Sequence, residues 1–106
     1  MNRKGEVYFN DCLCGIIEEN DQGYSFQYLE EWINSKDAQP ISKTLPLSKD
    51  QYFSNSLFPF FDGLIPEGWL LEIAISKWKL KRNDRFGLLL TVCEDVIGAV
   101  SVKGVN

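Results

Sequence analysis

The sequence contains no histidine and only three cysteines, Cys12, Cys14 and Cys93. Because Ser-His-Asp and Cys-His machinery needs an imidazole base, the absence of histidine excludes both types of catalytic site. Three thiols without framework spacing form no disulfide scaffold and are typical of a reducing compartment, so we expect a cytoplasmic protein. Without histidine or a second cysteine pair, we also expect no metal site.

Long apolar runs and glycine-rich phosphate loops are missing as well. No run of roughly 18 apolar residues occurs, and no apolar segment follows the charged N-terminus, so we expect neither a membrane span nor a secretion signal. No loop of the P-loop or dinucleotide type is present, so we expect no cofactor. The carboxylates of Glu18, Glu19 and Asp21 surround a predicted turn, which is typical of a solvated surface. An enzyme would need a pocket that holds two perturbed carboxylates, and by elimination we expect a binding protein.

The remaining composition is that of one acidic globular domain. The 106 residues are 44% hydrophobic and 25% charged, which suits a single domain, residues 1–106, with a modest core. The net charge is −4, from 11 basic and 15 acidic residues. Nucleic-acid-binding proteins usually carry a basic excess, so we expect no direct nucleic-acid binding.

The first 28 residues predict an antiparallel meander of three strands. Residues 5–10 and 12–18 are rich in strand formers, and Asn10-Asp11 between them tolerates the left-handed backbone of a hairpin turn. Residues 20–23 (NDQG) form the clearest turn of the sequence. Residues 24–28 then alternate aromatic and polar side chains, which indicates a half-buried strand.

The middle of the chain centres on residues 58–71. Its apolar first part predicts a short buried helical turn. We expect Pro66 at the first position of the next helix, where its missing N–H has no partner to lose. Glu67 then lies near the positive end of the helix dipole. Gly63 and Gly68 flank this junction and are expected to allow close backbone approach.

The second half predicts two longer helices and a final strand. The first helix spans about residues 67–79. Asn83-Asp84 is expected to cap a second helix from Arg85 to about Glu94. Residues 98–102 alternate small and β-branched side chains, as in a strand. The order of strands, helices and strand predicts an α+β fold, with two main helices packed on a small antiparallel sheet.

The helix over residues 67–80 is predicted to have two apolar sides. The side expected to pack on the sheet, about 140° wide, holds five residues, Leu70, Leu71, Ala74, Ile75 and Trp78. Trp69 and Ile73 are four residues apart and touch along the other side, where they face water together. Such a pair indicates a second contact surface. Alternatively, another part of the chain, such as the loop near Pro40, covers it.

Several segments carry a resemblance to a known family. They are residues 5–10 (GEVYFN), 23–28 (GYSFQY), 41–47 (ISKTLPL), 60–68 (FFDGLIPEG) and 85–89 (RFGLL), in that order. The pattern resembles the N-terminal subdomain of HipA-type serine/threonine kinases, the toxins of bacterial toxin–antitoxin modules. It covers roughly residues 5–103, and the run at 60–68 is its most specific part. The kinase body of that family is missing, so the chain is most similar to HipS-type antitoxins of three-gene HipBST modules.

The resemblance implies a function and partners. It implies a cytoplasmic antitoxin, not an enzyme, that binds and inhibits a short HipT-like serine/threonine kinase, with a HipB-like DNA-binding protein as the third component. The alternative is an accessory or scaffolding subunit that completes the kinase fold and supports its activity. We expect the partner-binding residues to be Pro66, Glu67, Gly68, Trp69 and Ile73, with Trp69 as an anchor inserted at or near the kinase active site.

Overall fold

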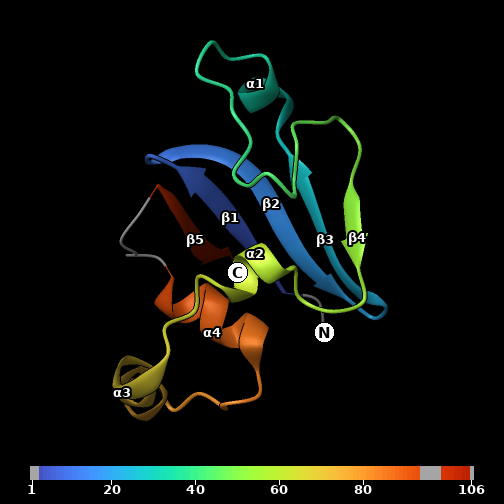
Figure 1. Ribbon diagram of the computed structural model, residues 1–106. Helices are drawn as coiled ribbons and strands as arrows, with labels where there is room; N and C mark the ends of the chain where they lie inside the picture. The colour runs from blue at the N-terminus through green and yellow to red at the C-terminus, as the bar shows by residue number, and fades with distance from the viewer. Residues whose placement is uncertain (1–2, 94–98, 106) are drawn as a thin grey trace.

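A five-stranded antiparallel sheet forms the centre of the computed structural model, which describes residues 3–93 and 99–105. The strands are β1 (Lys4–Phe9), β2 (Cys12–Asn20), β3 (Gly23–Tyr28), β4 (Tyr52–Ser54) and β5 (Val100–Val105). Their order is β4-β3-β2-β1-β5, so a meander is extended at one edge by β4 and at the other by the last strand (Figure 1). This arrangement confirms the predicted α+β class.

The turns of the meander lie where the sequence predicts them. Asn10 and Asp11 have φ angles of 48° and 67°, the left-handed backbone that these two residue types tolerate. Gly23 ends the second turn with a φ of 143°, which other residue types rarely adopt. The three predicted strands at residues 5–28 are therefore confirmed.

The two edge strands depart from the prediction in different ways. β4 was not predicted, because its three residues lie in a polar segment and pair with β3 over only three positions, from Tyr24 to Phe26. The predicted final strand is confirmed as β5, which runs to Val105 and pairs with β1. Residue 98, where that strand was predicted to begin, lies outside the described residues.

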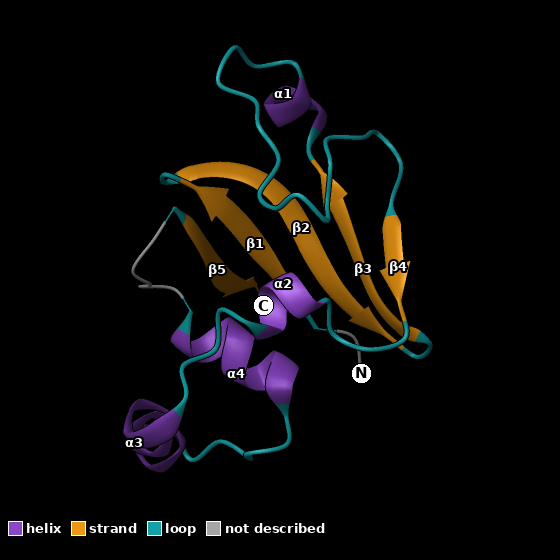
Figure 2. Ribbon diagram, in the orientation of Figure 1, coloured by secondary structure: helices purple, strands orange, loops and turns teal. Residues whose placement is uncertain are grey.

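In the described residues, the helices are α1 (Glu30–Ile33), α2 (Pro59–Asp62), α3 (Gly68–Trp78) and α4 (Arg85–Val92). Helices α2 and α4 lie across one face of the sheet (Figure 2). That face contributes fully buried side chains to the core, including Val7, Ile17 and Phe26. Phe61 of α2 is also fully buried, and its ring lies 5.4 Å from that of Phe26.

The first turn of α4 is held by a cap and an ion-pair network. Asp84 caps the helix as predicted, since its carboxylate accepts a hydrogen bond of 3.1 Å from the Gly87 N–H. Arg3 binds Asp84 and Glu19, each through two hydrogen bonds of 2.8–2.9 Å. This network ties the chain before β1 to β2 and to α4. The predicted end of this helix at Glu94 lies outside the described residues.

Helix α3 begins later than predicted. Pro66 was expected at its first position, but Glu67 is the extended residue before the helix, and the helix starts at Gly68. The preference of proline for the first position of a helix is met instead by Pro59, the first residue of α2. Within the described residues, no helix has both the length and the apolar character needed to cross a membrane.

Candidate partner-binding surface

Helix α3 lies on the far side of α4 from the sheet (Figure 1). Three apolar side chains attach this segment to the core, Leu71 and Ile75 within the helix and Leu80 just after it. No residue of α3 is buried. The helix therefore rests on the domain along one narrow side, and most of its surface faces outwards.

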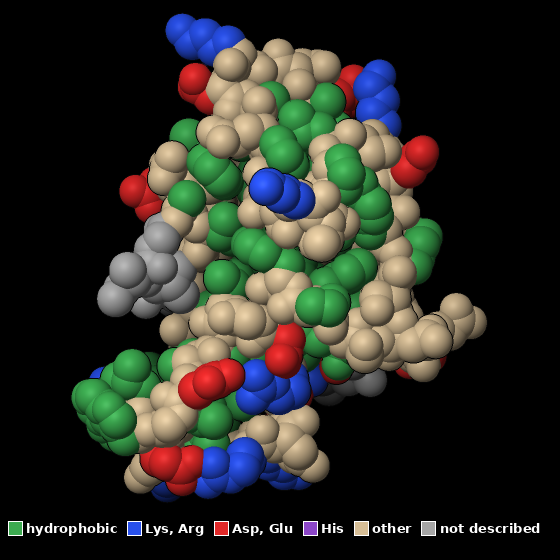
Figure 3. Space-filling model, in the orientation of Figure 1, with side chains coloured by type: hydrophobic (Ala, Val, Ile, Leu, Met, Phe, Trp, Pro, Cys, Tyr) green, Lys and Arg blue, Asp and Glu red, His purple; other side chains and the backbone are tan. Residues whose placement is uncertain are grey.

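The outward side of α3 is apolar. Trp69 is 71% exposed, Leu70 53%, Ile73 51% and Trp78 54%. We call these four side chains the α3 apolar surface. Hydrophobic side chains gather over α3 at the lower left of Figure 3. Exposed apolar side chains that gather in one place are typical of a binding site, so the α3 apolar surface is a candidate for one.

The predicted orientation of α3 is wrong for two residues of this surface. Leu70 and Trp78 were expected to pack on the sheet with Leu71, Ala74 and Ile75, but both are more than half exposed. Leu70 lies at one edge of the predicted stripe. Trp78 lies near the middle of the stripe but is the last residue of α3, so the contact that α3 makes is both narrower and shorter than predicted. Trp69 and Ile73 are exposed, as predicted.

A groove of about 300 Å³ separates α3 from the end of α4. Its α3 side includes Leu70, Ile73 and Trp78, and its α4 side consists of Thr91 and Val92. The α3 apolar surface is therefore hollowed on the side that faces α4. Such a groove suits an apolar side chain or a short segment of a partner.

The residues before α3 are exposed or half-buried at one end of this surface. Pro66 is half-buried, and Glu67 and Gly68 are exposed. Gly68 has a φ of 63°, and no atom would lie within 4 Å of an added Cβ. Its role is therefore to allow a positive φ and not, as predicted, close backbone approach. Of the five predicted partner-binding residues, only Trp69 and Ile73 are part of the α3 apolar surface.

The loop near Pro40 does not cover Trp69. This loop lies at the other end of the sheet, next to α1 (Figure 1). It is held there by two aromatic side chains: the Trp32 indole N–H donates to the Gln39 carbonyl at 3.1 Å, and the Tyr28 hydroxyl accepts from the Ile41 N–H at 3.0 Å. The alternative in which this loop buries Trp69 is therefore wrong.

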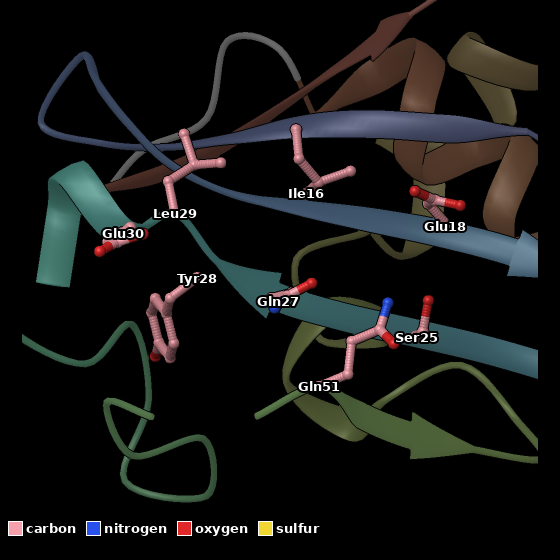
Figure 4. Close-up of a pocket in the computed structure, with 8 residues that line it drawn as sticks. All are labelled: Ile16, Glu18, Ser25, Gln27, Tyr28, Leu29, Glu30 and Gln51. Atoms are coloured by element: carbon pink, nitrogen blue, oxygen red, sulfur yellow. The ribbon is translucent and has the colours of Figure 1, made fainter. Parts of the chain in front are cut away.

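A second hollow lies on the sheet face opposite α2 and α4. It has a volume of about 260 Å³, and its lining includes Ile16, Glu18, Gln27 and Glu30. Figure 4 shows its two carboxylates, Glu18 and Glu30, at opposite ends, with Ile16 and Gln27 between them. Because they are separated in this way, the two carboxylates do not form an acid–base pair around one reacting atom.

The thiols offer no reactive centre in the core. Burial raises the pKa of Cys14 to about 12 and that of Cys93 to about 11. The Cys93 thiol donates to the Leu64 carbonyl at 3.4 Å, as expected for a buried structural cysteine. Cys12 is exposed. Among the described residues, no three Cys, Asp or Glu side chains are grouped so that they could hold a metal ion.

The fold and this surface together define a small α+β domain whose most prominent exposed feature is an apolar helix. Residues 5–103 match the family model described as the HipA N-terminal domain. The chain belongs to this family. The matched region is the N-terminal domain alone, and these 106 residues contain no kinase catalytic domain.

Individual relatives agree with the family assignment. A solved structure described as the N-terminal domain of HipA toxin superposes with a TM-score of 0.70 at 30% identity, over 98% of this chain and 93% of that one. An uncharacterized protein of Haemophilus influenzae is 30% identical over 95% of this chain and 92% of its own length. A putative kinase of Sinorhizobium fredii, Y4mE, is 26% identical over 91% of this chain but only 23% of its own length.

Proposed function

We propose that this protein is a HipS-type antitoxin that binds a short HipA-like serine/threonine kinase of the HipT type and inhibits it by direct contact. One observation carries the proposal: a HipA N-terminal domain exposes the α3 apolar surface, with Trp69 71% exposed. A large apolar surface on a small domain is typical of a protein-binding site. The protein itself is proposed to have no enzymatic activity.

The relatives support a kinase as the partner. In the putative kinase of Sinorhizobium fredii, the matched region is 23% of a longer chain. In the Haemophilus influenzae protein, it is 92% of the chain. The domain therefore occurs both as a small part of a longer protein and as nearly a whole one. Within the longer protein, the domain contacts the rest of its own chain. A separate domain could contact the same surface on a kinase that lacks this domain.

In the proposed complex, Trp69 is the anchor. Tryptophan is among the residue types most enriched at interface hot spots, where truncation to alanine often costs about 2 kcal/mol or more. Ile73 lies one turn further along α3 and extends the same contact. We propose that Trp69 enters the kinase at or near its active site, while Pro66, Glu67 and Gly68 contact the rim. A HipB-like DNA-binding protein is the proposed third component, and this protein contacts no nucleic acid itself.

The direct test is co-expression with a HipA-like kinase from the same genome, followed by growth, pull-down and kinase assays. An antitoxin should restore growth, co-purify with the kinase and lower its activity. If kinase activity rises in the complex, the protein is instead an accessory subunit that supports the kinase. The purified protein alone should neither bind ATP nor autophosphorylate, because it has no phosphate-binding loop or kinase catalytic loop.

A further inference from the structure

Charge is distributed unevenly along this acidic chain. Between residues 68 and 93, the span of α3 and α4, there are five basic and two acidic residues, a net charge of +3. The remaining residues include six basic and thirteen acidic side chains, a net charge of −7. The basic part of this acidic chain therefore includes the exposed helix α3.

Three lysines of this segment are free of direct ion pairs. Lys77, Lys79 and Lys81 are exposed, and none forms an ion pair with another described residue. The two arginines are different, since Arg82 binds Glu72 and Arg85 binds Asp62. The unpaired charge is thus concentrated at the end of α3 and just after it.

Lys77 adjoins the α3 apolar surface directly, and Lys79 and Lys81 follow it in the chain. Lys77 lines the groove between α3 and α4 together with Trp78, and its ammonium lies 5.5 Å from the centre of the Trp78 ring. Lys79 is the left-handed residue that ends α3. Lys and Arg side chains also appear beside α3 and α4 at the bottom of Figure 3.

Stability of the helix accounts for part of this pattern. A positive charge at a helix C-terminus interacts favourably with the helix dipole and contributes about 0.3–1 kcal/mol. Lys77 and Lys79 lie where this effect operates. Lys81 lies beyond the end of α3, where the dipole does not act, and its charge contributes to lowering the pKa of Asp84.

We propose that Lys77, Lys79 and Lys81 form a basic rim that directs the α3 apolar surface to an acidic surface of its partner protein. This inference rests on the proposed function and adds the charge of the partner surface. Kinase catalytic sites hold Mg²⁺ with aspartate side chains, so an acidic surface is available in the proposed partner. Charges at the rim of an interface mainly increase the association rate and make it dependent on salt.

A protein partner fits this surface better than a nucleic acid. Protein–DNA interfaces are more polar and far more basic than protein–protein interfaces. Here Lys77 lies beside Trp78, one of four exposed apolar side chains, and the rest of the chain, at −7, would repel phosphate groups. Apolar anchors within a charged rim are instead the usual arrangement of a protein-binding surface.

The test compares two triple variants with the same change of charge. One carries Lys77→Glu, Lys79→Glu and Lys81→Glu. The matched control carries Lys36→Glu, Lys43→Glu and Lys49→Glu, three exposed lysines in the segment between α1 and β4, at the other end of the domain from α3 (Figure 1). The association rate constant with a HipA-like kinase from the same genome is measured at low and high salt, after a thermal melt of each variant.

We expect the α3 variant to associate at least about tenfold more slowly than the parent at low salt, with a weaker dependence on salt. At 0.1 M salt the control should stay close to the parent, because the changed charges lie at the other end of the domain and interactions beyond about 10 Å are screened. A double variant, Lys77→Glu with Lys81→Glu, keeps Lys79, the left-handed residue that ends α3, and replaces the triple variant if that variant is unstable.

Each contrary result has a distinct meaning. If the parent binds the kinase but all variants associate at the parent's rate, the inference about the basic rim is wrong and the proposed function stands. If the parent does not bind the kinase, both fail. The parent is also tested for binding to a 20-base-pair DNA duplex, roughly two helical turns. If the parent binds this duplex and the α3 variant does not, the lysines bind DNA phosphates and the inference is wrong.

Discussion

Helices α3 and α4 are neighbours of similar apolar content, but the apolar side chains of α4 are buried and most of those of α3 are exposed. In α4, Phe86, Leu88 and Leu89 are fully buried against the sheet. In α3, no residue is buried, and the tryptophans at its two ends are more than half exposed. Apolar residues in α4 therefore stabilise the fold, whereas most of those in α3 contribute little to it. This difference is the main physical argument that α3 has another partner.

The starts of the two helices reinforce the contrast. Asp84 caps α4 and is itself bound by Arg3, whereas Glu67 before α3 makes no side-chain capping bond. Gly87 leaves room for this cap, since an added Cβ would lie 2.3 Å from the Asp84 carboxylate oxygen. One helix is fixed at its first turn by side chains from three parts of the chain, and the other is not.

The largest expected effect comes from the same substitution made in each helix. Leu88→Ala in α4 removes a fully buried side chain and should lower the free energy of unfolding by about 2–5 kcal/mol. Leu70→Ala in α3 removes a side chain that is 53% exposed, and the loss should be within about 0.5 kcal/mol. Urea unfolding of both variants measures the difference. Similar losses would mean that α3 belongs to the core after all.

The second comparison concerns binding rather than stability. Trp69→Ala should leave the melting temperature close to the parent's but weaken kinase binding by at least about 2 kcal/mol, which is more than about tenfold. The matched control is Phe53→Ala on β4, since Phe53 is 70% exposed and Trp69 71%. Titration calorimetry with the kinase gives both affinities. Equal affinities for the two variants would remove Trp69 from the interface.

The third prediction concerns the cap of α4 and its dependence on pH. The hydrogen bonds from Arg3 lower the pKa of Asp84 below its ordinary 3.8 in the folded state. The folded state then binds fewer protons than the unfolded state at low pH, so this stabilisation is present above pH 3.8 and is lost as the pH falls below that value.

Replacing Arg3 by Met should therefore cost about 1 kcal/mol at neutral pH, because its ion pairs are partly exposed and screened. The variant should also lose less further stability than the parent as the pH falls from 4 to 2. Denaturant unfolding at several pH values measures both effects. A parallel loss in parent and variant would show that another group is responsible.

The smallest effect is expected at Trp78, and it corrects the orientation predicted from periodicity. That orientation made Trp78→Ala strongly destabilising. Its 54% exposure leads us to expect a loss below about 1 kcal/mol, including the contact with Lys77. A thermal melt suffices, and a loss comparable to that of Leu88→Ala would restore the original prediction.

Local patterns in the sequence predicted the parts of the fold that depend on neighbours along the chain. The meander, its two turns and the Asp84 cap follow from residue types within a few positions of one another. Two features depend on distant partners instead. β4 exists only through its pairing with β3. The register of β2 against β1 shifts between Val7 and Tyr8, which leaves Cys14 as a bulge without a partner on β1, and this too depends on the pairing. Such pairings leave no clear signal in a short segment.

The candidate site was predicted in part for the same reason. Periodicity placed Trp69 and Ile73 on one side of α3 but did not show how narrow the contact on the other side is, so Leu70 and Trp78 were assigned to the core. The lysines at the end of α3 and just after it were missed because the net charge of −4 averages a basic segment with a strongly acidic remainder. Charge counted segment by segment would have found them.

Amide hydrogen exchange of this protein, alone and in the complex, tests whether the kinase covers α3. Because α3 has no buried side chain, its amides should exchange quickly in the free protein. In the complex, exchange over residues 68–78 should slow markedly, while β4 with Phe53 should be unchanged. Unchanged exchange in α3, with protection on β3 and β4 instead, would mean that the kinase binds the β4 edge of the sheet and not α3.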